Sequence, residues 1–146
     1  MTTYQYAGLL VGRVLLALIF VLSGFGKITG FEGTVGYMAA MGVPMPEMFL
    51  VPVILIELVG GLMIVAGFKA RWAALAIGLF LIPTSVIFHA FWAAPADQVA
   101  AQTIQFQKNL AIMGGMLYVL LVGPGRYSLD EIRRRGRPSK EPVSAS

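Results

Sequence analysis

Four long apolar runs fill most of this chain, and they restrict how it can fold. Of its 146 residues, 58% are hydrophobic and 12% are charged, whereas a typical soluble domain has about 25% charged residues. A soluble domain of this composition would expose too much apolar surface to stay dispersed. As helices, the runs are long enough to cross a bilayer about 30 Å thick. The sequence therefore predicts an all-α integral membrane protein, a four-helix bundle in which each helix spans the membrane.

The boundaries of the runs define a membrane domain, residues 1–126, followed by a basic tail, residues 127–146. The apolar core of the last run is short, so its helix is expected to begin near Val99. A further short helix at the membrane interface is expected at 31–41, because apolar residues there recur at helical spacing and Gly42 follows. The expected spans cover approximately residues 7–28, 48–68, 72–92 and 99–122.

The distribution of basic residues predicts the orientation in the membrane. Lys69 and Arg71 lie between the second and third spans, and six of the eleven basic residues follow Gly125. Cytoplasmic loops are enriched in Lys and Arg, so we expect a multi-pass protein of the plasma (inner) membrane with both termini in the cytoplasm. The loops at 29–47 and 93–107 then face outward.

The tail opens with a capping-box pattern that predicts a short helix. Ser128 is followed three residues later by Glu131, and the helix should run through Arg135. The residues from Ser139 onward are expected to be disordered. The simplest role for the tail arginines is to hold this helix against anionic lipid, and docking of a cytoplasmic protein is the alternative.

Composition also excludes several classes of site. The chain has no cysteine, which rules out disulfides, thiolate metal sites and iron–sulfur clusters built from it. A single histidine argues against a metal or haem centre. The net charge of +4 is concentrated in the tail, which favours a cytoplasmic membrane end over a nucleic-acid site. We therefore expect no metal, no haem, no iron–sulfur cluster and no nucleic-acid partner.

Glu57 is the only carboxylate inside any of the four runs. An acidic group at bilayer depth costs about 2.5–3.5 kcal/mol on insertion scales, so it must be paired, protonated or used. From helix lengths, its axial offset is about 9 Å from Arg13 and about 12 Å from Lys27, which makes Arg13 the first-choice partner. The sequence leaves open a buried structural tie, a binding or proton-transfer site, and an unpaired protonated Glu57.

A second group of polar residues is expected at the outer end of the bundle. Ser85 and His89 share one face of the third span, and a stripe of amides continues into the fourth span at helical spacing. Such a positively biased polar mouth suits an anion or a quinone head group, although ordinary interfacial anchoring explains it equally well. The candidate residues are Lys27, Ser85, His89, Trp92, Gln98, Gln102, Gln105, Lys108 and Asn109.

Small residues predict where the helices approach one another. In lipid, close backbone contact drives helix association, so faces carrying small residues are expected to point inward. These residues are Gly8 and Gly12 in the first span, Gly60 and Gly61 in the second, and Ala111 and Gly115 in the fourth.

Several segments together resemble the DoxX family of small four-span membrane proteins. They are GRVLLALIFVLSGFGKI (12–28), YMAAMGVPMP (37–46), IELVGGLMIVAGFKAR (56–71), FHAFW (88–92) and FQKNLAIMGGMLYVLLVGPGRYSLD (106–130). The resemblance implies a recurring polar set made of Arg13, Lys27, Glu57, His89, Lys108 and Asn109. It also implies links to quinone-dependent oxidation, to oxidative-stress complexes or to detoxification of catechols and quinones.

We therefore expect a membrane subunit or partner of a quinone-linked oxidoreductase or detoxification system. Glu57, Arg13 and the outer mouth would bind a quinone, and Glu57 or His89 would exchange protons with the quinol. The chain carries no self-contained catalytic motif, so whether it is itself an enzyme stays open. A proton-coupled or small-molecule transporter and a non-enzymatic scaffold are the alternatives, and assembly into a homo-oligomer is also left open.

Overall fold

The computed structural model describes residues 2–136, and the described part of the chain consists of helices joined by short turns and loops. The first half contains α1 (Thr3–Thr29), α2 (Phe31–Ala40), α3 (Pro46–Ile54), the π-helical segment η1 (Leu55–Val59) and α4 (Gly60–Ala66). The second half contains α5 (Ala70–Phe88), the 3-10 turn η2 (Phe91–Ala93), α6 (Val99–Val122) and α7 (Leu129–Arg135). The tail segment from Ser139, which we expected to be disordered, lies outside the described residues.

Three helical segments within residues 2–136 are long and apolar enough to cross a membrane: Thr3–Thr29, Pro46–Ala66 and Ala70–Ala93. The fourth long helix, α6, has 24 residues and coincides with the range expected from the sequence. Its first half carries the amide stripe, which lowers its hydropathy, but its length of about 36 Å also matches a bilayer. The all-α membrane bundle is thus confirmed. The side of the membrane that each end faces stays a prediction.

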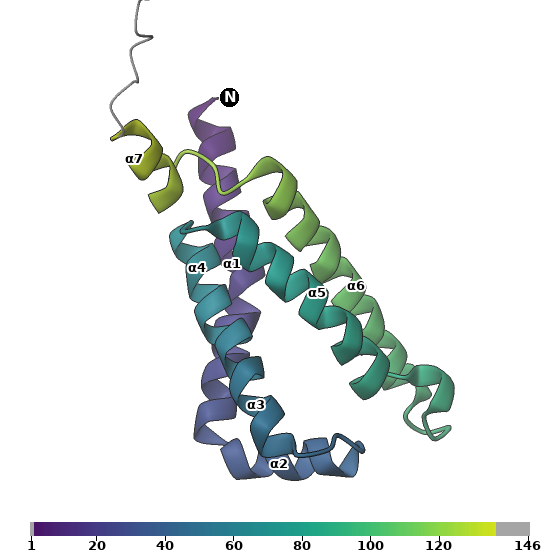
Figure 1. Ribbon diagram of the computed structural model, residues 1–146. Helices are drawn as coiled ribbons and strands as arrows, with labels where there is room; N and C mark the ends of the chain where they lie inside the picture. Colours follow the sequence, from purple (N-terminus) through teal and green to yellow (C-terminus); the bar gives the residue numbers. More distant parts are fainter. Residues whose placement is uncertain (1, 137–146) are drawn as a thin grey trace, which may run out of the picture.

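The long helices form two antiparallel pairs (Figure 1). Helix α1 packs along the second span, which is built from α3, η1 and α4, and α5 packs along α6. The pairs meet where α5 contacts α4 and η1, and α5 diverges from α3 toward the end of the bundle at which α2 lies crosswise. We call this the α2 end.

The common core lies nearer the opposite end, which we call the α7 end. Most of its side chains are small or branched and apolar, which lets the helices come close together. Many large apolar side chains outside it are exposed, such as Leu15 on α1 and Leu121 on α6, as expected for surfaces that face lipid. The buried core residues are Ala17, Phe20, Ile64, Ala70, Ala73, Ala74, Ile77, Leu81, Met116 and Val119.

Glycines set the closest contact between α1 and the second span. A Cβ atom added at Gly24 would lie 2.7 Å from the backbone nitrogen of Leu58. One added at Gly61 would lie 2.9 Å from the Val21 side chain. These two contacts fix how far α1 is shifted along the second span, and they place Gly24 level with η1.

The inward orientation expected for small residues holds only in part. Gly60 and Gly61 are buried, and Gly115 of α6 lies against Leu16 of α1. A Cβ atom at Gly8 or Gly12 would have no neighbour within 4 Å, so the G-x-x-x-G face of α1 does not pack closely against any other part of residues 2–136. Ala111 is also exposed. The prediction was wrong there because α6 makes few contacts with α1, and the one at Gly115 meets Leu16, which lies beyond Gly12 along α1.

Helix α7 is tied to the turn between α4 and α5. The Ser128 hydroxyl accepts a hydrogen bond from the Glu131 backbone N–H, as the capping pattern predicted. The Asp130 carboxylate accepts from the backbone N–H groups of Lys69, at 2.7 Å, and Ala70, at 3.1 Å. It thereby satisfies free donors at the start of α5. The described part of the tail therefore packs on the membrane bundle.

The contact at Gly24 can be tested with a matched pair of substitutions on the same helix. Gly24→Ala forces a methyl group against the backbone of η1, and overpacking of this kind costs about 1–3 kcal/mol of unfolding free energy. Gly26→Ala meets open space and should leave stability unchanged or slightly higher. Reversible unfolding in mixed detergent micelles measures both. Equal effects of the two variants would contradict the packing described here.

Candidate functional site

Glu57 is paired with Lys27, not with Arg13. The Lys27 ammonium group donates to Glu57 Oε2 at 2.7 Å and to the Ser23 hydroxyl at 2.6 Å. Glu57 is buried, with 6% of its surface exposed, while the Lys27 side chain keeps 24% exposure. The expected Arg13–Glu57 pair is thus corrected: the carboxylate is neutralised by Lys27, which lies on α1 as Arg13 does but nearer the other end of that helix.

The register of α1 explains the difference. Because Gly24 lies against Leu58 of η1, Lys27 is only about one helical turn along α1 from this contact. Arg13 is eleven residues from Gly24, which is about 16 Å along the helix axis. The sequence estimate measured each residue from assumed helix ends, and an error of a few residues at those ends reverses the preference between the two cations.

Arg13 instead binds backbone carbonyl groups at the α7 end. It donates to the carbonyl oxygens of Val65 at 3.0 Å and Tyr127 at 2.9 Å, and also to that of Pro124. Only 4% of its surface is exposed. These bonds join α1 to the end of the second span and to the loop that leads into α7. Arg13 therefore serves as a structural tie, remote from Glu57.

Glu57 lies at the middle of the π-helical segment η1. Segments of this kind are rare, and they appear frequently at functional sites. Sequence reasoning missed η1, since a five-residue departure from α-helical geometry leaves the apolar pattern of Met48–Phe68 almost unchanged. The nearby irregularities in the sequence were Pro52, which cannot donate a backbone hydrogen bond, and the Gly60–Gly61 pair that directly follows η1.

The ion pair borders a recess in the α2 end of the bundle. A cavity of about 180 Å³ contains Lys27 and Glu57 in its wall, and a more apolar cavity of about 470 Å³ adjoins it. Tyr37 of α2 stacks on Phe88 of α5, with ring centroids 5.7 Å apart, beside the first cavity. Both cavities are lined by Met38, Val53, Phe80, Thr84 and Phe88.

Sequence reasoning did not select any of these shared lining residues. They are apolar or weakly polar and come from three different segments, so neither charge nor periodicity distinguishes them from ordinary core residues. Only the divergence of α5 from α3, with α2 lying across the gap, brings them around one space.

Four of the predicted outer residues form hydrogen bonds that join α6 to the end of α5. His89 lines the smaller cavity, and its Nδ1 lies 3.0 Å from Oε1 of Gln102. Asn109 donates to the hydroxyl of buried Ser85 at 3.0 Å, and that hydroxyl donates to the Leu81 carbonyl group at 2.7 Å. The amide stripe on α6 therefore acts partly as a hydrogen-bond ladder to α5.

The other predicted outer residues lie away from the ion pair. Lys108, Gln105 and Gln98 are exposed, and Lys108 lines neither of the two cavities. Trp92 is 58% exposed and packs edge-to-face against Phe91 and Phe106. The single polar mouth expected from the sequence is thus a smaller group, in which Lys27, Glu57 and His89 share one cavity.

A double-mutant cycle tests the pairing of Glu57. Lys27→Met leaves the carboxylate buried and unpaired, which should cost about 3–5 kcal/mol of unfolding free energy, and adding Glu57→Gln should recover part of that loss. We expect a coupling energy of about 0.5–3 kcal/mol between these positions. Arg13→Gln and Glu57→Gln, combined as the control, should be additive within about 0.5 kcal/mol. Coupling to Arg13 in place of Lys27 would refute the assignment.

Comparisons with known proteins agree with this architecture. The family model described as DoxX matches residues 8–90. The inner membrane protein YqjF of Escherichia coli is 42% identical over 90% of this chain and 96% of its own length. Inner membrane protein YphA from the same organism is 39% identical over 84% of this chain and 87% of its own. No solved structure matches significantly. The chain is a membrane protein that belongs to the DoxX family.

Proposed function

We propose that this protein binds a quinone, or a related aromatic compound, in the recess at the α2 end and presents it to a partner oxidoreductase. The observation that carries the proposal is an apolar cavity that leads to a buried ion pair. Ligand sites are typically concave and mostly apolar, with a few polar groups that orient the ligand. We place the protein in the inner membrane with both termini cytoplasmic, as the names of its relatives and the basic turn and tail suggest.

The recess suits the shape and polarity of a quinone. The larger cavity is lined by side chains such as Phe49, Phe80 and Ile87, which would contact the ring substituents and the tail. The Lys27 ammonium group, still partly exposed, would donate a hydrogen bond to one quinone oxygen. Tyr37 and Phe88 would supply an aromatic wall beside the ring.

Within this site, Glu57 would act as the proton acceptor. Oxidation of a quinol releases two protons and two electrons. The Glu57 carboxylate would take one proton from the quinol hydroxyl group, and His89, in the wall of the same cavity, is the candidate for the second. The electrons would pass to the partner oxidoreductase, since the proposed role of this chain is to hold the ligand and move protons.

The main alternative, a proton-coupled transporter, requires a polar path from one side of the membrane to the other. Within residues 2–136, the bundle contains two buried polar clusters with a basic residue: the Lys27–Glu57 ion pair, and Arg13 with its backbone carbonyl partners. They lie at different levels along α1. Between them the described bundle is filled by apolar residues such as Ala17, Phe20 and Ile64. This packing favours a binding site open to one side over a transport path through the monomer.

Filling the recess tests the proposal. Val53 borders both cavities, so Val53→Phe should occlude the site and lower the affinity for decylubiquinone by about tenfold or more. Leu55→Phe introduces the same ring two residues farther along the second span, but at a side chain that is 55% exposed. It should leave the affinity for decylubiquinone within about twofold of the wild type. Equilibrium binding to purified protein in nanodiscs measures both.

A third variant separates the head-group contact from the apolar fit. Glu57→Gln keeps the shape of the site but removes the proton acceptor. The rate at which bound quinol is oxidised should therefore lose the pH dependence that it has on the wild type. Wild-type affinity in Val53→Phe would reject the recess as the binding site. In that case a non-enzymatic scaffold, which needs no ligand, would become the better hypothesis for the role of this protein.

A further inference from the structure

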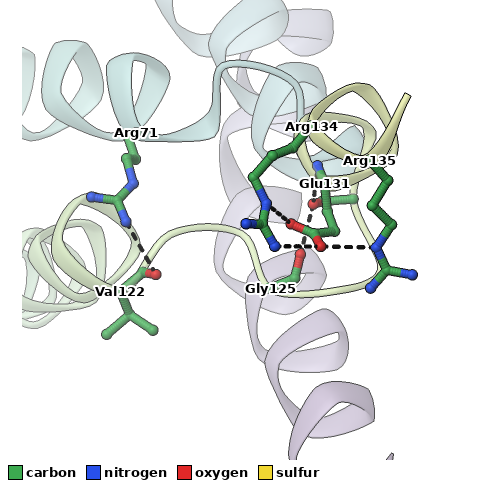
Figure 2. Close-up of polar contacts among 7 residues, drawn as sticks. Arg71, Val122, Gly125, Glu131, Arg134 and Arg135 are labelled. Atoms are coloured by element: carbon green, nitrogen blue, oxygen red, sulfur yellow. Dashed lines mark hydrogen bonds and ion pairs between the residues drawn. The ribbon is translucent and has the colours of Figure 1, made fainter. Parts of the chain in front are cut away.

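A separate cavity, of about 590 Å³, lies at the α7 end, away from the two cavities of the quinone recess. It is bordered by the loop that follows α6, by the start of α5 and by α7. Figure 2 shows Arg71 beside Val122 at the start of this loop. It also shows a cluster of Glu131, Arg134 and Arg135 beside Gly125, farther along the loop. Four arginines line the cavity: Arg71, Arg126, Arg134 and Arg135.

Two of these arginines share one carboxylate. Arg134 donates to both oxygens of Glu131, from Nε and Nη2 at 2.8 Å each, and Arg135 donates from Nε at 2.9 Å. These hydrogen bonds lower the pKa of Glu131 to about 2, so it stays ionised at neutral pH. One negative charge therefore faces two positive charges at this side of the cavity, which leaves one positive charge unbalanced.

The other two arginines have no carboxylate partner within residues 2–136. Arg71 donates to the Val122 carbonyl group at 3.3 Å, and Arg126 lies over the Tyr6 ring at 5.7 Å from its centroid. Asp130 also borders the cavity, but its oxygens are already bound to the backbone at the start of α5. The cavity wall thus has an excess of guanidinium groups with donors left over.

The loop after α6 is shaped to leave this space open. Gly123 has a φ of 89° and Gly125 a φ of 80°, a conformation that side-chain-bearing residues rarely adopt. A Cβ atom at Gly123 would also lie 3.1 Å from Nη2 of Arg71. Glycine at this position lets the backbone pass close to the guanidinium group without covering it.

We propose that this cavity binds a phosphate-bearing anion. Guanidinium groups present paired N–H donors that match the oxygens of a phosphate group, and an unbalanced arginine cluster provides the charge to hold it. Two sources offer this chemistry at the end of a membrane bundle: the head group of an anionic phospholipid and a soluble phosphate compound. Arg71 and Arg126 are the principal ligands, and Arg134 completes the site from α7.

The site is independent of the proposed quinone function. It shares no lining residue with either cavity of the recess, and it lies on the opposite side of the apolar core. Failure of one proposal therefore leaves the other standing.

The test uses the full chain and two probes. Native mass spectrometry of protein released from detergent measures binding of phosphatidylglycerol against phosphatidylcholine. Calorimetric titration with inorganic pyrophosphate, on protein in phosphatidylcholine nanodiscs, measures binding of a soluble anion. We expect Arg71→Gln/Arg126→Gln to weaken binding by about tenfold or more in at least one arm, since two charge-assisted contacts are removed. Loss in the lipid arm identifies a head group, and loss in the pyrophosphate arm identifies a soluble ligand.

Arg133→Gln is the matched control. It removes one positive charge from the α7 end, as Arg126→Gln does, but Arg133 lies over the Phe68 ring, 4.7 Å from its centroid, and does not line the cavity. Its affinities should stay within about twofold of the wild type. If the double variant misfolds, Arg126→Gln alone serves, because Arg126 is exposed and contacts only a ring. Absence of binding in both arms, or equal loss in Arg133→Gln, would overturn the proposal.

Discussion

The need to neutralise one carboxylate inside the membrane underlies the arrangement of this bundle. Glu57 lies on an otherwise apolar span, and an unpaired charge there would cost several kcal/mol. The Lys27 ammonium group provides the partner at 2.7 Å, and this fixes α1 beside the second span at one level. Gly24 permits that level by letting the two backbones touch one turn away from the pair. Pairing and close packing therefore reinforce each other.

The two basic residues of α1 lie toward opposite ends of the bundle. Lys27 belongs to the α2 end, where α5 diverges from α3 and leaves an apolar recess next to the ion pair. Arg13 belongs to the α7 end, where its bonds to backbone carbonyl groups hold the tail against the bundle. The apolar core between them separates the proposed quinone site from the proposed phosphate site. One helix thus organises both.

Those features of the fold that depend on local sequence could be predicted. Hydropathy located the long helices, and the bounds of α6 coincide with the expected range because a polar-to-apolar stripe marks its whole length. The Ser128 cap and the short helix α2 also follow from residues close in the chain. DoxX family membership, first suggested by the motifs, is shown by the matches to the family model and to two bacterial relatives.

The site could be predicted only in part, because it depends on how helices are shifted against one another. Glu57, Lys27 and His89 were candidates from the start, but their common cavity required the register set by Gly24. The same register removed Arg13 from the site. The π-helical segment and the apolar lining residues gave no signal in charge or periodicity, although they shape the recess. Tertiary contacts thus decide which polar residues meet.

The most direct test of the account is the distance between Lys27 and Glu57 in a lipid bilayer. Solid-state NMR of protein labelled with ¹⁵N at lysine side chains and ¹³C at glutamate carboxyl groups measures the dipolar coupling between Nζ and Cδ. Direct hydrogen bonding at 2.7 Å predicts a strong coupling that disappears in Lys27→Met and survives in Lys108→Gln. A coupling that is absent from the wild type, or that depends on Arg13 when arginine is labelled instead, would contradict it.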